Sequence, residues 1–338
     1  MTKIHKKWIV FALLCIWFFL TMFPLYWVAI TSFKNPYDVN RGATYLPFFD
    51  FSPTLKTFRE AVTGVRGDYF STFFNSAIIS TSATVVSVML GSMVAYALVR
   101  FVFRIRLLAG VLFLGAGIGT YLLLSQWANV RDIYAMAIAF IAALAAGVLS
   151  NFFKLPGPVL GNKDIVFWFV SQRMMPPIVS AFALYLLYSK IGKVGFKMLD
   201  SYFGMTLCYV AFSLPIVVWL MRDFFQSLPV ELEEAALVDN VPRYRIFLGI
   251  VLPISLPGLI AVSLITLGFI WNEFLFSLIL TSGKWQTLPI LLAGQNTYRG
   301  DEWWAISVAA VIAVGPMVII TVFLSRLMRS GLLLGSIK

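Results

Sequence analysis

Few residues in this 338-residue chain have the chemistry of a catalytic or metal site. His5 is the single histidine, and Cys15 and Cys208 both fall within long apolar runs. An enzyme embedded in a membrane would need a cluster of ionisable groups, and only Arg173 and Glu273 are placed to supply one. The sequence also lacks a Gly-x-x-x-x-Gly-Lys-Ser/Thr phosphate-binding loop. We therefore expect no catalytic residues, no metal site and no ATP hydrolysis through that motif.

The polar residues that can mediate binding gather in one stretch, Arg222–Arg245. Ser227 is expected to cap a helix that has Pro229 in its first turn, because serine accepts hydrogen bonds from the first helical N–H groups. The next residues, Glu233 to Ala236, continue this helix. Its adjacent alanines allow a close approach to a partner surface, and its carboxylates can meet basic groups there.

A turn is expected where this helix ends, at Asp239 and Asn240, because asparagine tolerates the left-handed conformation better than most residues. Pro242 is then expected to start a second helix that continues into an apolar run. The stretch therefore predicts a short helix–turn–helix at the cytoplasmic face, between two membrane spans.

The composition indicates that the bilayer is the solvent of this chain. It is 60% hydrophobic and only 12% charged, with a mean hydropathy of +0.88. Soluble globular proteins are roughly 45–50% apolar and about 25% charged, so too few polar residues remain here to cover a soluble fold. The net charge of +11 comes from basic residues beside apolar runs, which is typical of cytoplasmic flanks. We therefore expect contact with membrane lipid and no nucleic-acid partner.

Long apolar runs predict the membrane-spanning elements. A helix needs roughly 20 residues to cross the hydrocarbon core, and lipid offers no partner to unpaired backbone groups, so each run is expected to be helical. Seven runs contain no Asp, Glu, Lys or Arg, and an eighth, Ile165–Ser189, contains only Arg173; the seven are Trp8–Phe33, Tyr69–Val99, Leu107–Val130, Ile133–Phe153, Ser201–Met221, Ile246–Asn272 and Trp303–Ser325. We predict an all-α integral membrane protein of about eight spans with both termini in the cytoplasm.

The polar stretch resembles the EAA signature of binding-protein-dependent ABC importer permeases. Glu234-Ala235-Ala236, then Asn240, then Ile250-Val251-Leu252-Pro253 match its spacing. Asn240 stands where the family usually has glycine, and since asparagine can adopt positive φ the turn is expected to survive. Further segments resemble the carbohydrate-uptake subfamily: Asn75-Ser76, Tyr96-Ala97, Arg100-Phe101, Arg173 to Pro177, Trp271 to Phe274, Gln286 to Pro289 and Gly331 to Gly335.

The resemblance implies a type I ABC importer permease core of six transmembrane helices. It covers about residues 8–103 and 165–338, so an additional pair of helices is inserted between them. The predicted organisation is 1–103 for the first two spans with an outer loop, 104–164 for the inserted pair, and 165–338 for the rest of the core with a coupling helix in 222–248. An inserted pair preserves the in/out order of everything downstream.

By the same resemblance, the chain is a non-catalytic permease of the inner membrane that moves a sugar or sugar-like solute. Its implied partners are a second permease, two ATP-binding subunits that bind ATP and magnesium, and an extracytoplasmic solute-binding protein. The residues implied to couple it to an ATPase subunit are Glu233, Glu234, Ala235, Ala236, Asp239, Asn240, Arg243 and Phe247.

The sequence leaves two questions open: which residues line the translocation pathway, and which solute is carried. Trp271, Asn272 and Glu273 lie at the expected outer end of the span that begins with the run Ile246–Asn272. They are candidates for the translocation pathway, because an ionisable residue within a span usually faces a protein interior or a water-filled cavity. The solute is also open: a permease of the same fold for an amino acid, polyamine or phosphate ester is the alternative. A membrane enzyme lacks the ionisable cluster it would need, and a channel has no use for an ATPase-docking segment.

Overall fold

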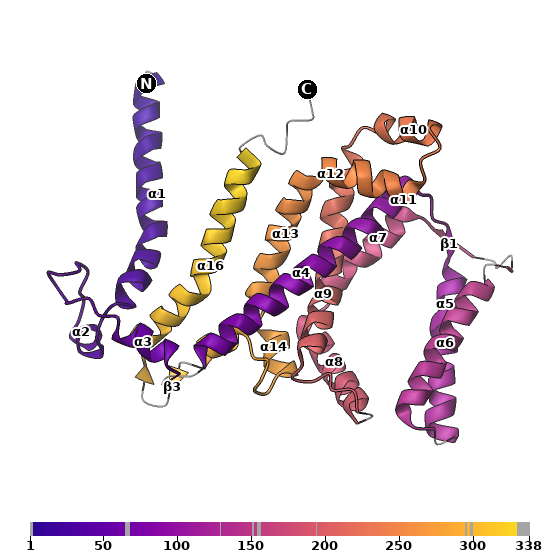
Figure 1. Cartoon of the computed structure of the whole chain (residues 1–338), viewed down its shortest axis with the longest axis horizontal. Coiled ribbons are helices and arrows are strands. Elements are labelled where there is room, and N and C mark those ends of the chain that lie inside the picture. The colour runs from indigo at the N-terminus through magenta and orange to yellow at the C-terminus, as the bar shows by residue number, and fades with distance from the viewer. Residues whose placement is uncertain are drawn as a thin grey trace. The chain divides into compact units, whose positions relative to one another are not determined.

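The computed structural model describes residues 3–64, 68–128, 130, 131–150, 152–153, 157–193, 195–294, 296–297 and 300–329 (Figure 1). These residues are predominantly helical, which confirms the predicted all-α membrane class. The chain forms two compact units: residues 1–77 with 286–323, and residues 78–285 with 324–338.

Five helices are long and apolar enough to cross a membrane, and two bent helix pairs qualify if each pair is one span. The predicted run Ile133–Phe153 corresponds to a shorter apolar helix, Tyr134–Ser150. All these assignments rest on length and composition within the described residues. The number of eight spans therefore stays a prediction.

The first unit joins the beginning and the end of the described chain. Its elements are α1 (Lys3–Thr31), α2 (Pro36–Asn40), α3 (Lys56–Val62), the start of α4 (Tyr69–Arg100), α15 (Leu288–Ala293), β3 (Asn296–Thr297), β4 (Gly300–Asp301) and most of α16 (Trp303–Arg329). The Asn75 side-chain amide donates to the Gln286 carbonyl at 3.1 Å, and the Ser76 hydroxyl accepts from the Leu288 N–H at 2.8 Å. Two segments that are distant in sequence are thus held together by side-chain to backbone bonds.

The second unit contains most of the bundle. Its elements after α4 are β1 (Ile105–Arg106), α5 (Leu107–Leu122), η1 (Leu123–Trp127), α6 (Asp132–Ser150), β2 (Val159–Leu160), α7 (Asn162–Ser171), η2 (Gln172–Met174), α8 (Pro177–Gly192), α9 (Tyr202–Gln226), α10 (Glu231–Val238), α11 (Arg243–Ile246), η3 (Phe247–Val251), α12 (Leu252–Ile254), α13 (Leu256–Trp271) and α14 (Leu275–Leu280). Helix α9 packs against α7, α13 and α14 and buries Val217 and Met221 completely.

Two predicted spans are broken. The run Ile165–Ser189 was expected to be one helix, but α7 and α8 meet at a 90° bend. Pro176 and Pro177 lack backbone N–H groups and disfavour the helical conformation of the preceding residue, so Met175 is extended (φ −72°, ψ 132°). The helix that begins at Arg243 likewise bends by 77° at Ser255, between Pro253 and Pro257. Both breaks thus lie at paired or closely spaced prolines, whereas Pro215 lies inside the continuous helix α9.

Helices α5 and α6, in the region predicted to be an insertion, pack side by side through small residues. Ala135, Ala139 and Ala143 of α6 are buried, and a Cβ atom on Gly117 of α5 would lie 3.2 Å from the side chain of Ala143. Small residues let membrane helices approach closely, as the composition of this region predicts. Antiparallel pairing of β1 with β2 joins the two ends of this region, with Ile105 opposite Leu160.

The contact between α4 and α9 depends on Gly91, which provides the first test. A Cβ atom there would lie 2.5 Å from Val217 Cγ1, and the β-branched, fully buried Val217 has little freedom to move. Gly91→Ala is therefore expected to destabilise the protein by about 1–3 kcal/mol through overpacking. Thermal unfolding of the purified protein, followed by tryptophan fluorescence, measures this change.

The matched control is Gly119→Ala in α5, where nothing lies within 4 Å of the added atom. Alanine favours a helix interior by about 0.8–1.0 kcal/mol over glycine, so this variant should unfold at the same or a higher temperature. Equal midpoints for both variants would contradict the proposed close approach at Gly91.

Candidate functional site

The polar stretch predicted to bind a partner forms a projecting elbow, Glu231–Ile246, made of α10, a turn and α11. The elbow follows α9 and leads into the bent helix pair of the second unit (Figure 1). Asn240 in its turn has φ +57°, which confirms the left-handed conformation expected from the sequence. The Val241 N–H donates to the Ala236 carbonyl at 3.0 Å and closes the end of α10. The second helix begins after Pro242, as predicted.

The predicted helix cap at Ser227 is wrong. Helix α9 continues to Gln226, so Ser227 ends that helix, and its hydroxyl donates to the Phe224 carbonyl at 2.6 Å. Helix α10 begins at Glu231, after Val230, which supplies no side-chain cap. Ser227 therefore lies too early in the chain to cap α10, because a capping hydroxyl bonds to N–H groups two or three residues ahead.

Glu233 points into the bundle instead of outward. Its carboxylate accepts a hydrogen bond from the Tyr96 hydroxyl at 2.8 Å and forms an ion pair with Arg100, whose Nε lies 2.7 Å away. Arg100 also donates to the Phe225 carbonyl at 3.4 Å. Glu233 is 5% exposed, so these bonds satisfy a carboxylate that has little access to water. We call Glu233, Arg100 and Tyr96 the brace, because they tie α10 to the end of α4.

An aromatic cluster packs where the elbow joins the bundle. The ring of Phe247 lies 4.8 Å from the ring of Tyr96 and 6.4 Å from that of Phe225, between centroids. These three residues come from α4, α9 and the start of η3, so one contact region joins three elements to the elbow. Phe247–Val251 forms a π-helix. Single-turn π-helices occur frequently at functional sites.

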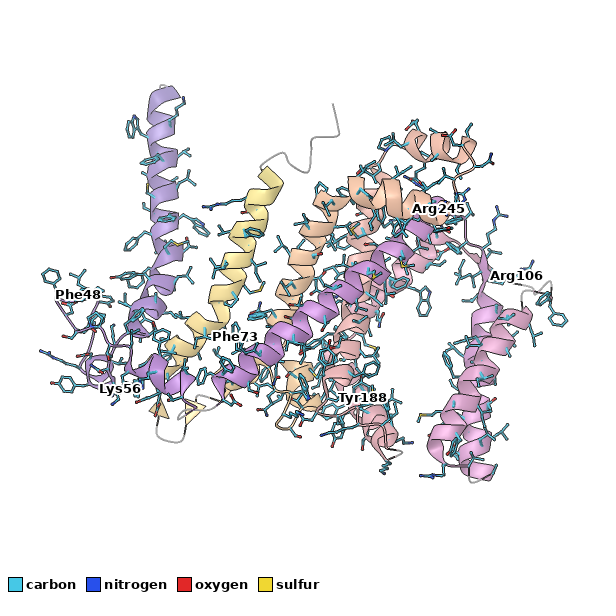
Figure 2. The ribbon with its side chains drawn as sticks, in the orientation of Figure 1. Phe48, Lys56, Phe73, Arg106, Tyr188 and Arg245 are labelled. Carbon is cyan, nitrogen blue, oxygen red and sulfur yellow. The ribbon has the colours of Figure 1, made fainter. Side chains whose placement is uncertain are left out.

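The outer face of the elbow is a mixed polar and apolar surface (Figure 2). Among the predicted coupling residues, Glu234, Ala235, Asp239, Asn240 and Arg243 are exposed, whereas Glu233, Ala236 and Phe247 are buried. Large apolar side chains accompany the exposed ones: Leu232 is 46%, Tyr244 61% and Val238 82% exposed. Arg245, which is labelled in Figure 2, lies on the same short helix as Tyr244. Such a surface can bind another protein.

The sequence interpretation did not identify Tyr96, Arg100 or Phe225 as parts of this site. Tyr96 and Arg100 lie over 130 positions before Glu233, and nothing in their spacing indicates a contact. One feature of the sequence could have indicated the contact. Arg100 is a charged residue at the end of a long apolar run, and such a residue usually pairs with a carboxylate.

The three pathway candidates have different environments. Trp271 is buried, and the Asn272 side chain is exposed and donates to the Gly268 carbonyl at 2.8 Å. The Glu273 carboxylate accepts from the Phe276 N–H at 3.0 Å and from the Tyr209 hydroxyl at 3.0 Å, and so caps α14. Glu273 also lines a small cavity of about 170 Å³, together with Arg173, Tyr209, Phe212 and Ser213.

Within the described part of the chain, no three His, Cys, Asp or Glu side chains are grouped so that they could hold a metal ion. The Arg173 guanidinium lies over the Phe269 ring, 5.4 Å from its centroid. An aromatic ring attracts a cation through its electron-rich face, so Phe269 stabilises the charge of Arg173 within the unit.

Comparison with known proteins gives consistent matches. A sequence model of the family described as "binding-protein-dependent transport system inner membrane component" matches residues 163–333, half of the chain, including the whole elbow. The diacetylchitobiose uptake system permease protein DasC of Streptomyces coelicolor is 27% identical, over 94% of this chain and 92% of that protein. The trehalose/maltose transport system permease protein MalG of Thermococcus litoralis is 25% identical, over 94% of this chain and 91% of that protein.

One solved structure shares the fold. A chain from a bacterial ABC transporter involved in the import of the acidic polysaccharide alginate matches with a TM-score of 0.61. Its sequence is 17% identical, and the match covers 96% of this chain and 98% of that chain.

The brace provides a test of how the elbow is held. Removing one partner of a buried ion pair leaves an uncompensated charge and typically costs about 3–5 kcal/mol. Glu233→Leu and Arg100→Leu are each expected to lower the unfolding temperature clearly, whereas the double variant should recover much of the loss. Thermal unfolding of the four proteins, arranged as a double-mutant cycle, measures the coupling.

Glu231→Leu is the matched control, because Glu231 lies on the same helix but is exposed. Its replacement should change the unfolding temperature little, since surface substitutions usually stay within about 0.5 kcal/mol. Strictly additive losses in the Glu233/Arg100 cycle would show that the two residues do not act as a pair.

Proposed function

We propose that this chain, which belongs to the family of binding-protein-dependent transport system inner membrane components, translocates a sugar or sugar-like solute. The chain is a multi-pass inner-membrane permease subunit of an ABC importer and is not itself an enzyme. The sugar class is supported by the names of its relatives, which refer to diacetylchitobiose and to trehalose and maltose uptake. Delivery of the solute by an extracytoplasmic solute-binding protein completes the proposal.

The elbow is the proposed site of coupling to ATP hydrolysis. One observation carries this assignment: the segment with the EAA spacing presents Glu234 and Ala235 outward on a helix whose inner side is fixed by a buried ion pair. An exposed, rigidly held helix suits a surface on which a second protein exerts force. We place the elbow on the cytoplasmic face, seated on an ATP-binding subunit.

Force applied to the elbow would pass into the bundle by two routes. The brace connects α10 to α4 through Arg100 and Tyr96. The aromatic cluster connects the start of η3 to α4 and α9 through Tyr96 and Phe225. Because packed interiors resist compression, a displacement of the elbow moves these helices together. Closure of the ATP-binding subunits would in this way switch the permease between inward- and outward-facing states.

The proposed assembly contains a second permease, two ATP-binding subunits and the solute-binding protein. ATP and magnesium would be bound by the ATP-binding subunits. With the elbow in the cytoplasm, the proposed topology places both termini of the chain there as well. This arrangement agrees with the basic residues near the N-terminus, Lys3, Lys6 and Lys7.

Charge and size changes on the outer face of the elbow test the coupling assignment. Glu234→Lys and Ala235→Glu are expected to abolish solute uptake and assembly with the ATP-binding subunits, since one reverses a charge and the other places a bulky charge at the contact. Membrane insertion should stay normal, because neither residue packs inside the bundle. Transport assays in vesicles and co-purification of the ATP-binding subunits measure both effects.

Asp223→Lys is the control, because it makes a similar charge change on α9, outside the elbow. Its ion pair with Arg222, at 3.7 Å, involves a half-exposed carboxylate and contributes about 0–1 kcal/mol. This variant should transport normally. Solute-stimulated ATP turnover at the native rate in the Glu234→Lys or Ala235→Glu complex would refute the assignment.

The second part of the proposal places the cavity beside Glu273 on the translocation pathway, near Trp271 and Asn272. A cavity inside a membrane bundle that is lined by an arginine, a glutamate and aromatic side chains has the donors, acceptors and flat apolar faces that suit a sugar. The Glu273 carboxylate also fixes the start of α14, so its position is well defined.

Filling this cavity tests its role. Ser213 is 6% exposed and lines the cavity, so Ser213→Leu should occupy part of the space and reduce uptake about tenfold or more, which corresponds to about 1.4 kcal/mol. Assembly with the ATP-binding subunits should be unaffected. Thr21→Leu on the exposed surface of α1 adds comparable apolar volume away from the cavity and should leave uptake unchanged. Native uptake by the Ser213→Leu importer would remove this cavity from the pathway.

A further inference from the structure

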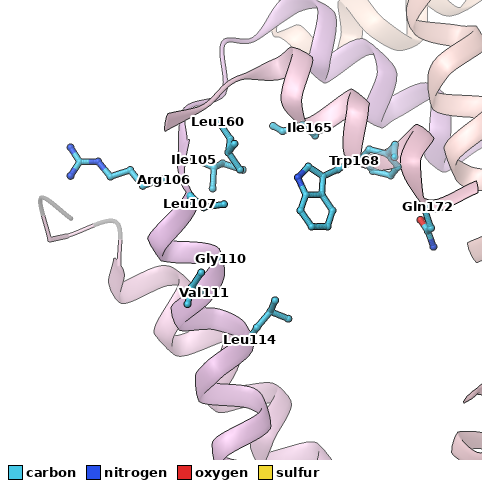
Figure 3. Close-up of a pocket in the computed structure, with 11 residues that line it drawn as sticks. Ile105, Arg106, Leu107, Gly110, Val111, Leu114, Leu160, Ile165, Trp168 and Gln172 are labelled. Carbon is cyan, nitrogen blue, oxygen red and sulfur yellow. The ribbon is translucent and has the colours of Figure 1, made fainter. Parts of the chain in front are cut away.

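An apolar groove separates the inserted helix α5 from α7 of the core, within the second unit (Figure 3). Its volume is about 570 Å³, which makes it larger than the cavity beside Glu273. In Figure 3 the side chains of Leu114 and Trp168 extend into the space between the two helices. The lining is mainly aliphatic and aromatic, and includes Ile105, Leu107, Val111, Leu114, Ile165 and Trp168.

The two ends of the groove differ. Gln172 supplies the polar group at one end, on η2, whereas the other end lies at the β1–β2 pair and the starts of α5 and α7. Arg106 is the basic residue of the lining, and Arg104 and Lys163 are close to lining residues in the sequence. In Figure 3 the Arg106 guanidinium points away from the space between the two helices, so its long side chain must turn to reach the groove end. The acidic residue nearby, Asp164, is engaged by the Gly161 N–H at 2.8 Å.

An apolar space with basic residues beside one end matches an amphiphile with a negative head group. A sugar does not match it, because the wall offers few polar side chains. Basic pockets between transmembrane helices on the cytoplasmic side are suited to phospholipid head groups. Long basic side chains at such an interface also extend toward phosphate while their stems cover apolar surface.

We propose that this groove holds one molecule of an anionic glycerophospholipid as a bound lipid. Its acyl chain would lie along Leu107, Val111 and Leu114 on one side and Trp168 on the other. Its phosphate would lie at the end of the groove beside the β1–β2 pair, where the long side chains of Arg104, Arg106 and Lys163 can turn toward it. The lipid would fill the space between the inserted pair and the core, and so join them beyond the β1–β2 pairing. This inference does not depend on which solute the permease carries.

Gly110 offers a direct way to fill the groove. It lines the groove on α5, and a Cβ atom added there would meet nothing within 4 Å, so Gly110→Trp inserts a large side chain without a clash at its first atom. Gly115→Trp is the matched control, because Gly115 is on the same helix, equally open, and outside the groove lining. Each variant would be purified as the full importer complex from membranes that contain phosphatidylglycerol and phosphatidylcholine.

Native mass spectrometry then counts the phosphatidylglycerol retained by each complex. Gly110→Trp should lose the tightly held lipid, whereas Gly115→Trp should retain it as the unmodified complex does. A second pair of changes, Arg104→Gln with Arg106→Gln, should lower the preference for phosphatidylglycerol over phosphatidylcholine by about fivefold for each charge removed, which follows from about 1 kcal/mol per basic residue. This pair leaves the apolar wall intact and reports on the head group alone.

Three results would overturn the proposal. The first is undiminished retention of phosphatidylglycerol by Gly110→Trp, including the case in which a protein segment fills the groove. The second is an equal loss in both glycine variants, which would indicate a general effect on the lipid around the helices. The third is equal retention of phosphatidylcholine and phosphatidylglycerol by the unmodified complex, because the basic residues would then have no role.

Discussion

The arrangement around the elbow depends on how the Glu233 carboxylate is satisfied away from water. A buried charge is costly unless it is paired and hydrogen-bonded, and Arg100 and Tyr96 provide both interactions from the end of α4. The geometry of α10 follows from this requirement, since its inner side must face α4. The opposite side, which carries Glu234 and Ala235, is then directed outward. One inward carboxylate thus determines which residues of the EAA segment are available to a partner.

The same constraint shapes the other end of α9. The Glu273 carboxylate accepts backbone N–H groups at the start of α14 and the Tyr209 hydroxyl, while Arg173 lies over the Phe269 ring. Outside the spans, Asp200 follows the same rule. Burial acts to raise the pKa of its carboxyl, but the N–H groups of Trp285, Lys284 and Ser282 hold that pKa below its ordinary value. Charged groups in this chain are therefore positioned by the partners they require.

Local chemistry made part of this structure predictable. The positive φ of Asn240, the breaks at paired or closely spaced prolines and the close packing of alanine-rich α6 each depend on residues that are near one another in sequence. The inward direction of Glu233 was not predictable, because it depends on a partner over 130 positions away. The cap assigned to Ser227 was wrong because α9 is longer than its apolar run: the helix continues through charged residues to Gln226.

The pairing of β1 with β2 has a consequence for the history of the chain. Ile105 and Leu160 are opposite each other in an antiparallel ladder, where facing Cα atoms lie about 4.5–5.5 Å apart. The polypeptide therefore leaves the core and returns to it at nearly the same point. A segment whose ends are adjacent can be inserted or deleted without changing the path of the chain on either side. The predicted insertion of a helical hairpin at residues 104–164 is compatible with this geometry.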